Sequence, residues 1–184
     1  MSTRPPQRKA VPADVPKIAA LMRRSVEELF PLFHDERDTA AAARFLTVPD
    51  TMLIDDGTYY VHEAEGEIVA CGGWSKRDKL YTGSGDQSGD ARLLDPATEP
   101  ARVRAMFVRG DFARRGLGRA ILTSCAQDAA ADGYRSLVLM ATLPGVPLYQ
   151  AFGFREVGRE DLPLPDGTTL AGVAMERELA EDGR

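Results

Sequence analysis

The chain has 184 residues, of which 43% are hydrophobic and 28% charged, and a formal net charge of −5. These values are typical of a globular protein, and the length predicts a single domain over residues 1–184 with its core at about 7–178. The negative charge argues against a nucleic-acid partner, and no apolar run reaches the roughly 20 residues that cross a bilayer, so a cytoplasmic location is expected. Cys71 and Cys125 lie far apart in the sequence, which predicts neither a disulfide framework nor a metal site.

The first third of the chain is predicted to form a short strand at residues 7–11 and two helices. The first helix is expected to begin at Asp14, its predicted N-cap, because apolar residues recur at helical spacing after it. A second helix is expected over residues 38–46. Pro49-Asp50 is expected to end that helix.

From Gly57 onward the apolar residues alternate, which predicts strands. Residues 58–64 and 68–74 are expected to pair as a hairpin around the turn Glu65-Gly66-Glu67. Residues 81–100 are rich in Gly, Ser, Asp and Pro without a periodic apolar pattern, so a long loop is predicted there, and a loop of that length is either mobile or functional.

The second half of the chain alternates strands with helices. A helix ending before Gly133 is indicated by an apolar stripe that includes Leu117 and Ile121. The expected elements are a strand at 101–108, this helix at about 116–132, a buried strand at 136–140, a short helix at 146–152, a strand at 154–158 and a strand at 170–175 after the Asp166-Gly167 turn. The pattern predicts one α/β domain built on a mixed sheet.

An arginine- and glycine-rich loop joins the strand at 101–108 to the helix that follows. A helix N-terminus presents free N–H groups, and Gly116 and Gly118 let the backbone approach an anion closely. Arg114, Arg115 and Arg119 add charge around it. The third glycine of a dinucleotide fingerprint and the Gly-Lys-Ser/Thr of a nucleotide-triphosphate loop are both missing. On these residues alone, a phosphate site and a solvated basic turn both stay open.

A second cluster, Tyr149-Gln-Ala-Phe-Gly153-Phe154, follows the buried strand. Together with Arg114–Arg119, in this order and spacing, it resembles the GNAT superfamily of N-acetyltransferases, over about residues 58–178. The resemblance implies a central, mostly antiparallel sheet of six to seven strands flanked by about four helices. Three positions depart from the family pattern: Ala113 replaces a Gln or Arg, Thr142 an Asn and Gly145 an Ala.

The resemblance also implies a site. Acetyl-CoA would be the co-substrate, and the acceptor would be a small-molecule or peptide amine, with no metal, no nucleic acid and no membrane involved. The pantetheine arm would pair with the backbone of Met106, Phe107 and Val108. The pyrophosphate would bind the loop formed by Arg114, Arg115, Gly116, Leu117, Gly118 and Arg119, and Thr142 would contact the cofactor. Tyr149 would protonate the departing thiolate. A homodimer is suggested by analogy alone.

No residue is marked as the general base. His34, in the segment that lines the acceptor pocket in this family, is the preferred histidine over His62, and Glu99 and Asp111 are alternatives acting through water; each also fits a solvated or structural role. Cys125 and Cys71 are expected to pack as small apolar groups rather than to act as nucleophiles. Trp74 and Tyr81 fit an acceptor pocket or simple packing.

Two function classes therefore remain. The first is an acyl-CoA-dependent enzyme that transfers an acetyl group to a primary amine by direct attack. The second is a non-catalytic acyl-CoA-binding or interaction domain of the same fold, which Ala113 and Thr142 favour. Turnover with any amine distinguishes the two classes.

Overall fold

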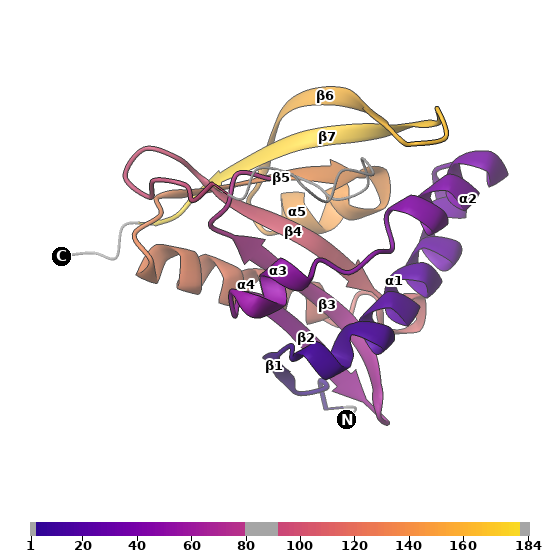
Figure 1. Cartoon of the computed structure of the whole chain (residues 1–184), viewed down its shortest axis with the longest axis horizontal. Coiled ribbons are helices and arrows are strands. Elements are labelled where there is room, and N and C mark those ends of the chain that lie inside the picture. Colours follow the sequence, from indigo (N-terminus) through magenta and orange to yellow (C-terminus); the bar gives the residue numbers. More distant parts are fainter. Residues whose placement is uncertain (1–2, 80–91, 181–184) are drawn as a thin grey trace.

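The structure, a computed structural model, describes residues 3–79 and 92–180, and all seven strands lie in one sheet (Figure 1). The strand order is β1-β2-β3-β4-β5-β7-β6, and every neighbouring pair is antiparallel except β4 and β5, which are parallel. The strands are β1 (Gln7–Lys9), β2 (Tyr59–Ala64), β3 (Glu67–Ser75), β4 (Ala101–Val108), β5 (Ser136–Thr142), β6 (Arg155–Pro163) and β7 (Thr169–Glu178). The expected mixed, mostly antiparallel sheet is confirmed.

Five α-helices accompany the sheet, one more than expected. They are α1 (Val15–Leu29), α2 (Glu36–Phe45), α3 (Thr51–Asp55), α4 (Leu117–Ala131) and α5 (Val146–Ala151). Helices α1 and α3 pack on one face of the sheet, and α4 and α5 pack on the other. Of the helices in the described residues, none combines the length and the apolar character needed to span a bilayer.

The additional helix corrects the prediction made for Pro49-Asp50. The Asp50 carboxylate accepts a hydrogen bond of 3.1 Å from the Met52 N–H, so Asp50 begins α3 rather than ending α2. Asp14 is the N-cap residue of α1, as predicted, but its side chain does not cap the helix. Its carboxylate accepts from the Val11 N–H at 2.8 Å and from the Arg8 guanidinium at 2.7 Å, and it makes no capping bond to α1.

Two hairpins differ from prediction in their lengths. The turn between β2 and β3 consists of Glu65 and Gly66 alone, with φ of 53° and 79°, the mirror-image turn that matches strand twist. The β6–β7 hairpin extends well beyond the expected residues and turns at Gly167, where φ is 84°. Its far end carries Leu162, which packs against α1 and α2.

The sheet opens between its two parallel strands. Only two residue pairs join β4 to β5, Ala101 with Leu137 and Arg102 with Val138, after which the strands diverge. On its other side β4 carries an extra residue against β3, because Gly73 pairs with Arg104 but Cys71 pairs with Phe107. A bulge of this kind bends a strand, so the second half of β4 leans away from β5.

The bulge places Ala105 in the left-handed region, with φ of 53°. The Tyr59 hydroxyl of β2 donates to the Ala105 carbonyl at 2.8 Å, which holds the bulge from the far side of β3. A non-glycine residue held in this conformation costs on the order of 1 kcal/mol. The surrounding packing therefore maintains the bend in β4 at an energetic cost.

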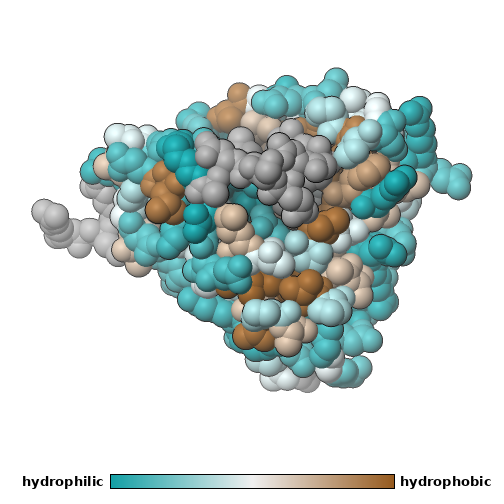
Figure 2. Space-filling model, in the orientation of Figure 1, coloured by the Kyte–Doolittle hydropathy of each residue, from teal (hydrophilic) through white to brown (hydrophobic). Residues whose placement is uncertain are grey.

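The apolar core is divided by the sheet. One cluster lies under α4 and α5 and includes Trp74, Ile121, Leu137 and Tyr149. Two others lie on the opposite face, one under α1 and α3 and one between α1, α2 and the β6–β7 hairpin. Most of the surface visible in Figure 2 is hydrophilic, with apolar side chains in separate patches.

Candidate active site

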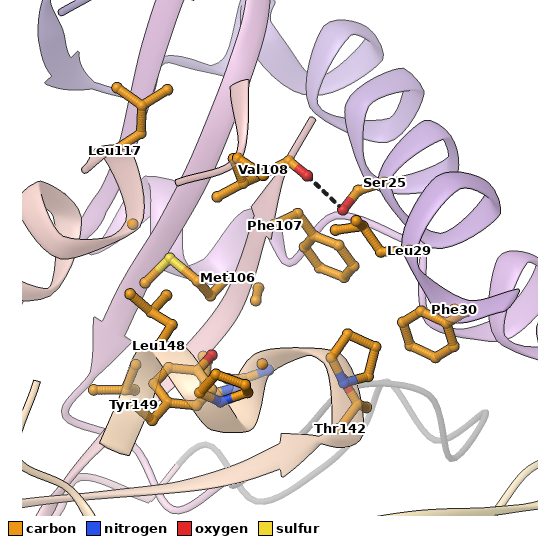
Figure 3. A pocket seen from close by; sticks show the side chains of 18 of the residues that line it. Ser25, Leu29, Phe30, Met106, Phe107, Val108, Leu117, Thr142, Leu148 and Tyr149 are labelled. Carbon is orange, nitrogen blue, oxygen red and sulfur yellow. Dashed lines mark hydrogen bonds between the residues drawn. The ribbon is translucent and has the colours of Figure 1, made fainter. Parts of the chain in front are cut away.

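A cavity of about 760 Å³ occupies the opening between β4 and β5 (Figure 3). Its size falls within the range of small-molecule and cofactor sites. Ten of the eleven predicted site residues line it: Met106, Phe107, Val108, Arg114, Gly116, Leu117, Gly118, Arg119, Thr142 and Tyr149. The exception is Arg115, which is not among the lining residues and whose guanidinium lies 4.7 Å from the centre of the Phe112 ring.

The loop before α4 has an unusual backbone. Arg114 and Gly116 both have positive φ, 62° and 80°, and no side chain caps the helix. The first helical hydrogen bond runs from the Ala120 N–H to the Gly116 carbonyl at 3.0 Å. The N–H groups of the first helical turn therefore have no helical partner, and they carry the positive end of the helix dipole next to the cavity.

Gly118 has a packing role beside that loop. A Cβ at this position would lie 2.7 Å from Cδ2 of Leu148 on α5. Gly145 plays the same part for Tyr149, since a Cβ there would lie 2.9 Å from the Tyr149 ring. Both glycines allow the elements that frame the cavity to approach each other closely.

The second half of β4 presents a free edge to the cavity. The Arg109 N–H donates to the Val69 carbonyl of β3 at 2.9 Å, and donors alternate along a strand, so the N–H and carbonyl of Val108 point away from β3. The Ser25 hydroxyl of α1 donates to that carbonyl at 2.8 Å (Figure 3). The Val108 N–H points away from β3, and Val108 lines the cavity.

Tyr149 projects from α5 to the cavity wall. Its side chain is 8% exposed, and its ring packs edge-on against Phe154 at 5.9 Å. Burial raises the pKa of its phenol above the ordinary value of 10. Among the described residues the hydroxyl has no hydrogen-bond partner. The phenol is therefore protonated at neutral pH and free to donate a proton or a hydrogen bond into the cavity.

None of the four candidate bases lines this cavity. His34 stacks on Phe30 at 5.2 Å but lines a separate hollow between α1 and α2. His62 is buried in β2, where its Nδ1 meets the Pro5 carbonyl at 2.8 Å. Glu99 pairs with Arg92 and Asp111 with Arg109, both at the surface. None of the four is therefore placed to act as a base in this cavity.

Cys125, Cys71 and Trp74, which were considered as nucleophiles or as pocket residues, do not line the cavity either. Cys125 and Cys71 are buried, and burial raises the pKa of both thiols, that of Cys71 to about 12, so neither is a thiolate at neutral pH. Trp74 is buried and packs edge-on with Tyr134. Tyr81 and residues 80–91 of the predicted loop lie outside the described residues. Within the described ranges, no cluster of His, Cys, Asp or Glu could hold a metal ion.

One wall of the cavity was not predicted from the sequence. Apolar side chains of α1, α2, β5 and the β6–β7 hairpin meet there: Leu29, Phe30, Leu46, Met140, Leu162, Leu164 and Leu170. In the sequence these residues look like ordinary core positions in four separate segments. The one available signal was that Leu29 and Phe30 lie close to His34, in the helical segment that lines the acceptor pocket in the family that the sequence resembles.

The sequence matches the model of the acetyltransferase (GNAT) family over residues 19–154. The chain belongs to the GNAT family. The match includes the loop before α4 and the segment from Tyr149 to Phe154, from which the resemblance was inferred. No curated protein matches the chain.

Solved structures of GNAT proteins share the fold. A GCN5-related N-acetyltransferase from Rhodopseudomonas palustris aligns with a TM-score of 0.70 and 18% identity, covering 97% of this chain and 98% of the other. PaiA N-acetyltransferase from Thermoplasma acidophilum, in complex with coenzyme A, gives 0.68 and 12%, covering 96% and 99%. A putative acetyltransferase from Salmonella typhimurium, with acetyl-CoA, gives 0.62 and 16%, covering 99% and 98%. At these identities the likeness establishes the fold.

Proposed function

We propose that this GNAT protein is an acetyl-CoA-dependent N-acetyltransferase that acetylates a primary amine by direct attack, within one domain over about residues 7–178. The observation that carries the proposal is the opening between β4 and β5. One cavity there joins an uncapped helix N-terminus, a free strand edge and a protonated tyrosine. Acetyl-CoA supplies the acetyl group as an activated thioester.

The α4 end of the cavity fits a pyrophosphate. The free N–H groups of the first turn of α4 point outward from the helix, and Arg114 and Arg119 line the same wall. Positive φ at Gly116, with no atom within 4 Å of an added Cβ, leaves open space directly against the backbone. Two arginines and a helix dipole together favour a doubly charged phosphate group there.

The β4 edge fits an extended amide chain. Its free N–H and carbonyl groups can pair with the amides of the pantetheine arm as a neighbouring strand would. The Val108 N–H is directed into the cavity and can donate to the thioester carbonyl oxygen, where negative charge develops during attack. Ser25 bonds to the carbonyl of the same residue and so restrains this part of the strand.

Proton transfer at the leaving group is assigned to Tyr149. The amine nitrogen forms a bond to the acyl carbon as the carbon–sulfur bond breaks, and the thiolate requires a proton. Because burial raises the pKa of Tyr149, the phenol keeps its proton at neutral pH and can serve as an acid but not as a base. The amine must therefore lose its own proton to water or bind in its neutral form.

Thermal unfolding tests cofactor binding. Acetyl-CoA, CoA, ATP and NADH are compared in parallel, and a ligand at about 100 times its dissociation constant adds about 2.7 kcal/mol. The midpoint should rise by roughly 5–10 °C with the two CoA species alone. An equal rise with ATP or NADH would contradict the proposal and make the loop a general phosphate site.

Substitution of Tyr149 tests the chemistry. Tyr149→Phe should lower kcat for amine acetylation by about 100-fold or more, because the general acid is lost, while the thermal shift with CoA is retained. Tyr134→Phe is the matched control, since the Tyr134 hydroxyl bonds to the Leu94 carbonyl at 3.3 Å and does not line the cavity. Tight CoA binding without turnover in the wild type would favour a non-catalytic binding domain instead.

A further inference from the structure

The cavity passes through the sheet and has two chemically different halves. Side chains alternate along β4, so Met106 faces α4 while Phe107 faces α1 and α2. The half on the α4 side contains the arginine loop and Tyr149. The other half, here called the acceptor half, lies against the third apolar cluster and is the side from which an amine would reach the thioester.

The acceptor half is apolar on every wall. Leu29 ends α1 and Phe30 follows it, Leu46 follows α2 directly, and the sheet side is closed by Phe107 and Met140. The β6–β7 hairpin adds the leucines at positions 162, 164 and 170. The side-chain hydroxyls on this side are those of Ser25, which is bonded to Val108, and Thr142. A ligand here meets mainly hydrocarbon.

No acidic side chain and no histidine lines either half of the cavity within the described residues. The charged residues that line it are Arg104, Arg114 and Arg119. Arg104 is buried and paired with Asp50, whose carboxylate is thereby occupied. His34 lies behind Phe30 and opens to a different hollow. The field of the lining side chains is therefore neutral to positive.

We propose that the acceptor is a primary amine on an apolar body that carries no second positive charge. This inference rests on the proposed function and narrows its substrate class. An apolar monoamine gains free energy by burying its hydrocarbon against these walls. A second ammonium group would lose its hydration there without meeting a carboxylate of the lining residues that the structure describes. Diamines, polyamines and amino groups flanked by basic residues should therefore be poor acceptors.

The test compares two matched pairs of acceptors with the full-length protein and acetyl-CoA. Hexylamine and 1,6-diaminohexane differ by one terminal ammonium, and the peptides Leu-Gly-Gly and Lys-Gly-Gly differ by one side-chain charge. In at least one pair the apolar member should be acetylated, with kcat/KM at least about 100-fold higher than that of its charged partner. An equal or higher kcat/KM for the charged members would overturn the inference while leaving acetyltransferase activity established.

A charge introduced into the acceptor half supplies an independent test. Leu46 lines the cavity and is only half-buried, so we expect Leu46→Glu and the neutral control Leu46→Gln both to fold. The quantity to compare is kcat/KM for the charged acceptor divided by kcat/KM for its apolar partner. This ratio should be about tenfold or more higher in Leu46→Glu than in Leu46→Gln. Leu29→Glu with Leu29→Gln repeats the test from α1, and a retained thermal shift with CoA reports an intact fold.

The outcomes distinguish a failure of the inferred substrate class from a failure of the proposed acetyltransferase activity. If the ratio is unchanged in both glutamate variants, the acceptor does not contact these walls and the inference fails. If CoA raises the unfolding midpoint but no amine or peptide in the panel is acetylated, the proposed function fails and the inference with it. Acetylation that prefers the apolar members, reversed or weakened by the glutamates, supports both.

Discussion

At the scale of single residues, His62 illustrates how burial fixes a protonation state. Its Nδ1 lies 2.8 Å from the Pro5 carbonyl, so Nδ1 carries the proton, and its Nε2 is buried without a partner among the described residues. Protonation would place an unpaired N–H in the interior. Burial therefore lowers the pKa of His62 below 6.5, although the bond to the Pro5 carbonyl opposes the shift.

This shift predicts a loss of stability on mild acidification. Below about pH 6.5 the unfolded chain binds a proton at this position while the folded chain does not, so the free energy of unfolding falls until the pH reaches the folded pKa. Urea unfolding at pH values from 7.5 to 5 should show this decrease. The decrease should be smaller in His62→Gln, and an identical pH dependence in the two proteins would contradict the assignment.

At the scale of secondary-structure elements, Gly118 controls how closely α4 approaches α5. Gly118→Ala should destabilise the protein by about 1–3 kcal/mol, because the added Cβ meets Leu148. Leu148→Ala in the same chain should recover part of that loss, giving a coupling of about 0.5–3 kcal/mol in a double-mutant cycle. Urea unfolding of the four proteins measures it.

Gly116→Ala is the matched control for that cycle. Its Cβ enters open space, so its cost comes from the positive φ alone, about 1–2 kcal/mol, and should show no coupling to Leu148. Equal coupling at both glycines would mean that backbone strain rather than the contact with Leu148 explains the result at Gly118.

The sequence predicts elements well where their signals are local. The strand β4 was predicted with its observed bounds, and the start of α4 was located within one residue by its glycines. Helix α3 was missed because it has five residues and follows Pro49-Asp50, a pair that also fits the end of a helix. The length of β6 was missed because most of Arg155–Asp161 is exposed on both faces, so no alternation marks the strand.

The same distinction explains which half of the site could be predicted. The arginine loop and Tyr149 belong to short motifs whose spacing is visible in the chain. The acceptor half depends on Phe30, Leu46 and Leu164, which are far apart in sequence and resemble core residues. They become a cavity wall only because β4 bends at Ala105, and that bend is produced by tertiary contacts such as the Tyr59 hydrogen bond.

At the scale of the whole molecule, the three apolar clusters share one sheet and should unfold together. Trp74, the single tryptophan, reports on the cluster under α4. In a Trp74→Phe variant that also carries Phe45→Trp, the fluorescence reports on the cluster between α1 and α2. Both signals, and the far-UV circular dichroism, should give one coincident thermal transition. Separate midpoints would contradict a single domain.

The divergence of β4 and β5 also bears on solubility. Unpaired strand edges at the rim of a sheet recruit strands from other molecules and start aggregation. Here the unpaired stretch of β4 lies inside the protein, between α1 and the loop that precedes α4, and is reached through the cavity. A strand from another molecule could pair with this stretch only by entering the cavity. The proposed ligand site is thus also the place where the sheet keeps its unpaired hydrogen-bonding groups away from the rim.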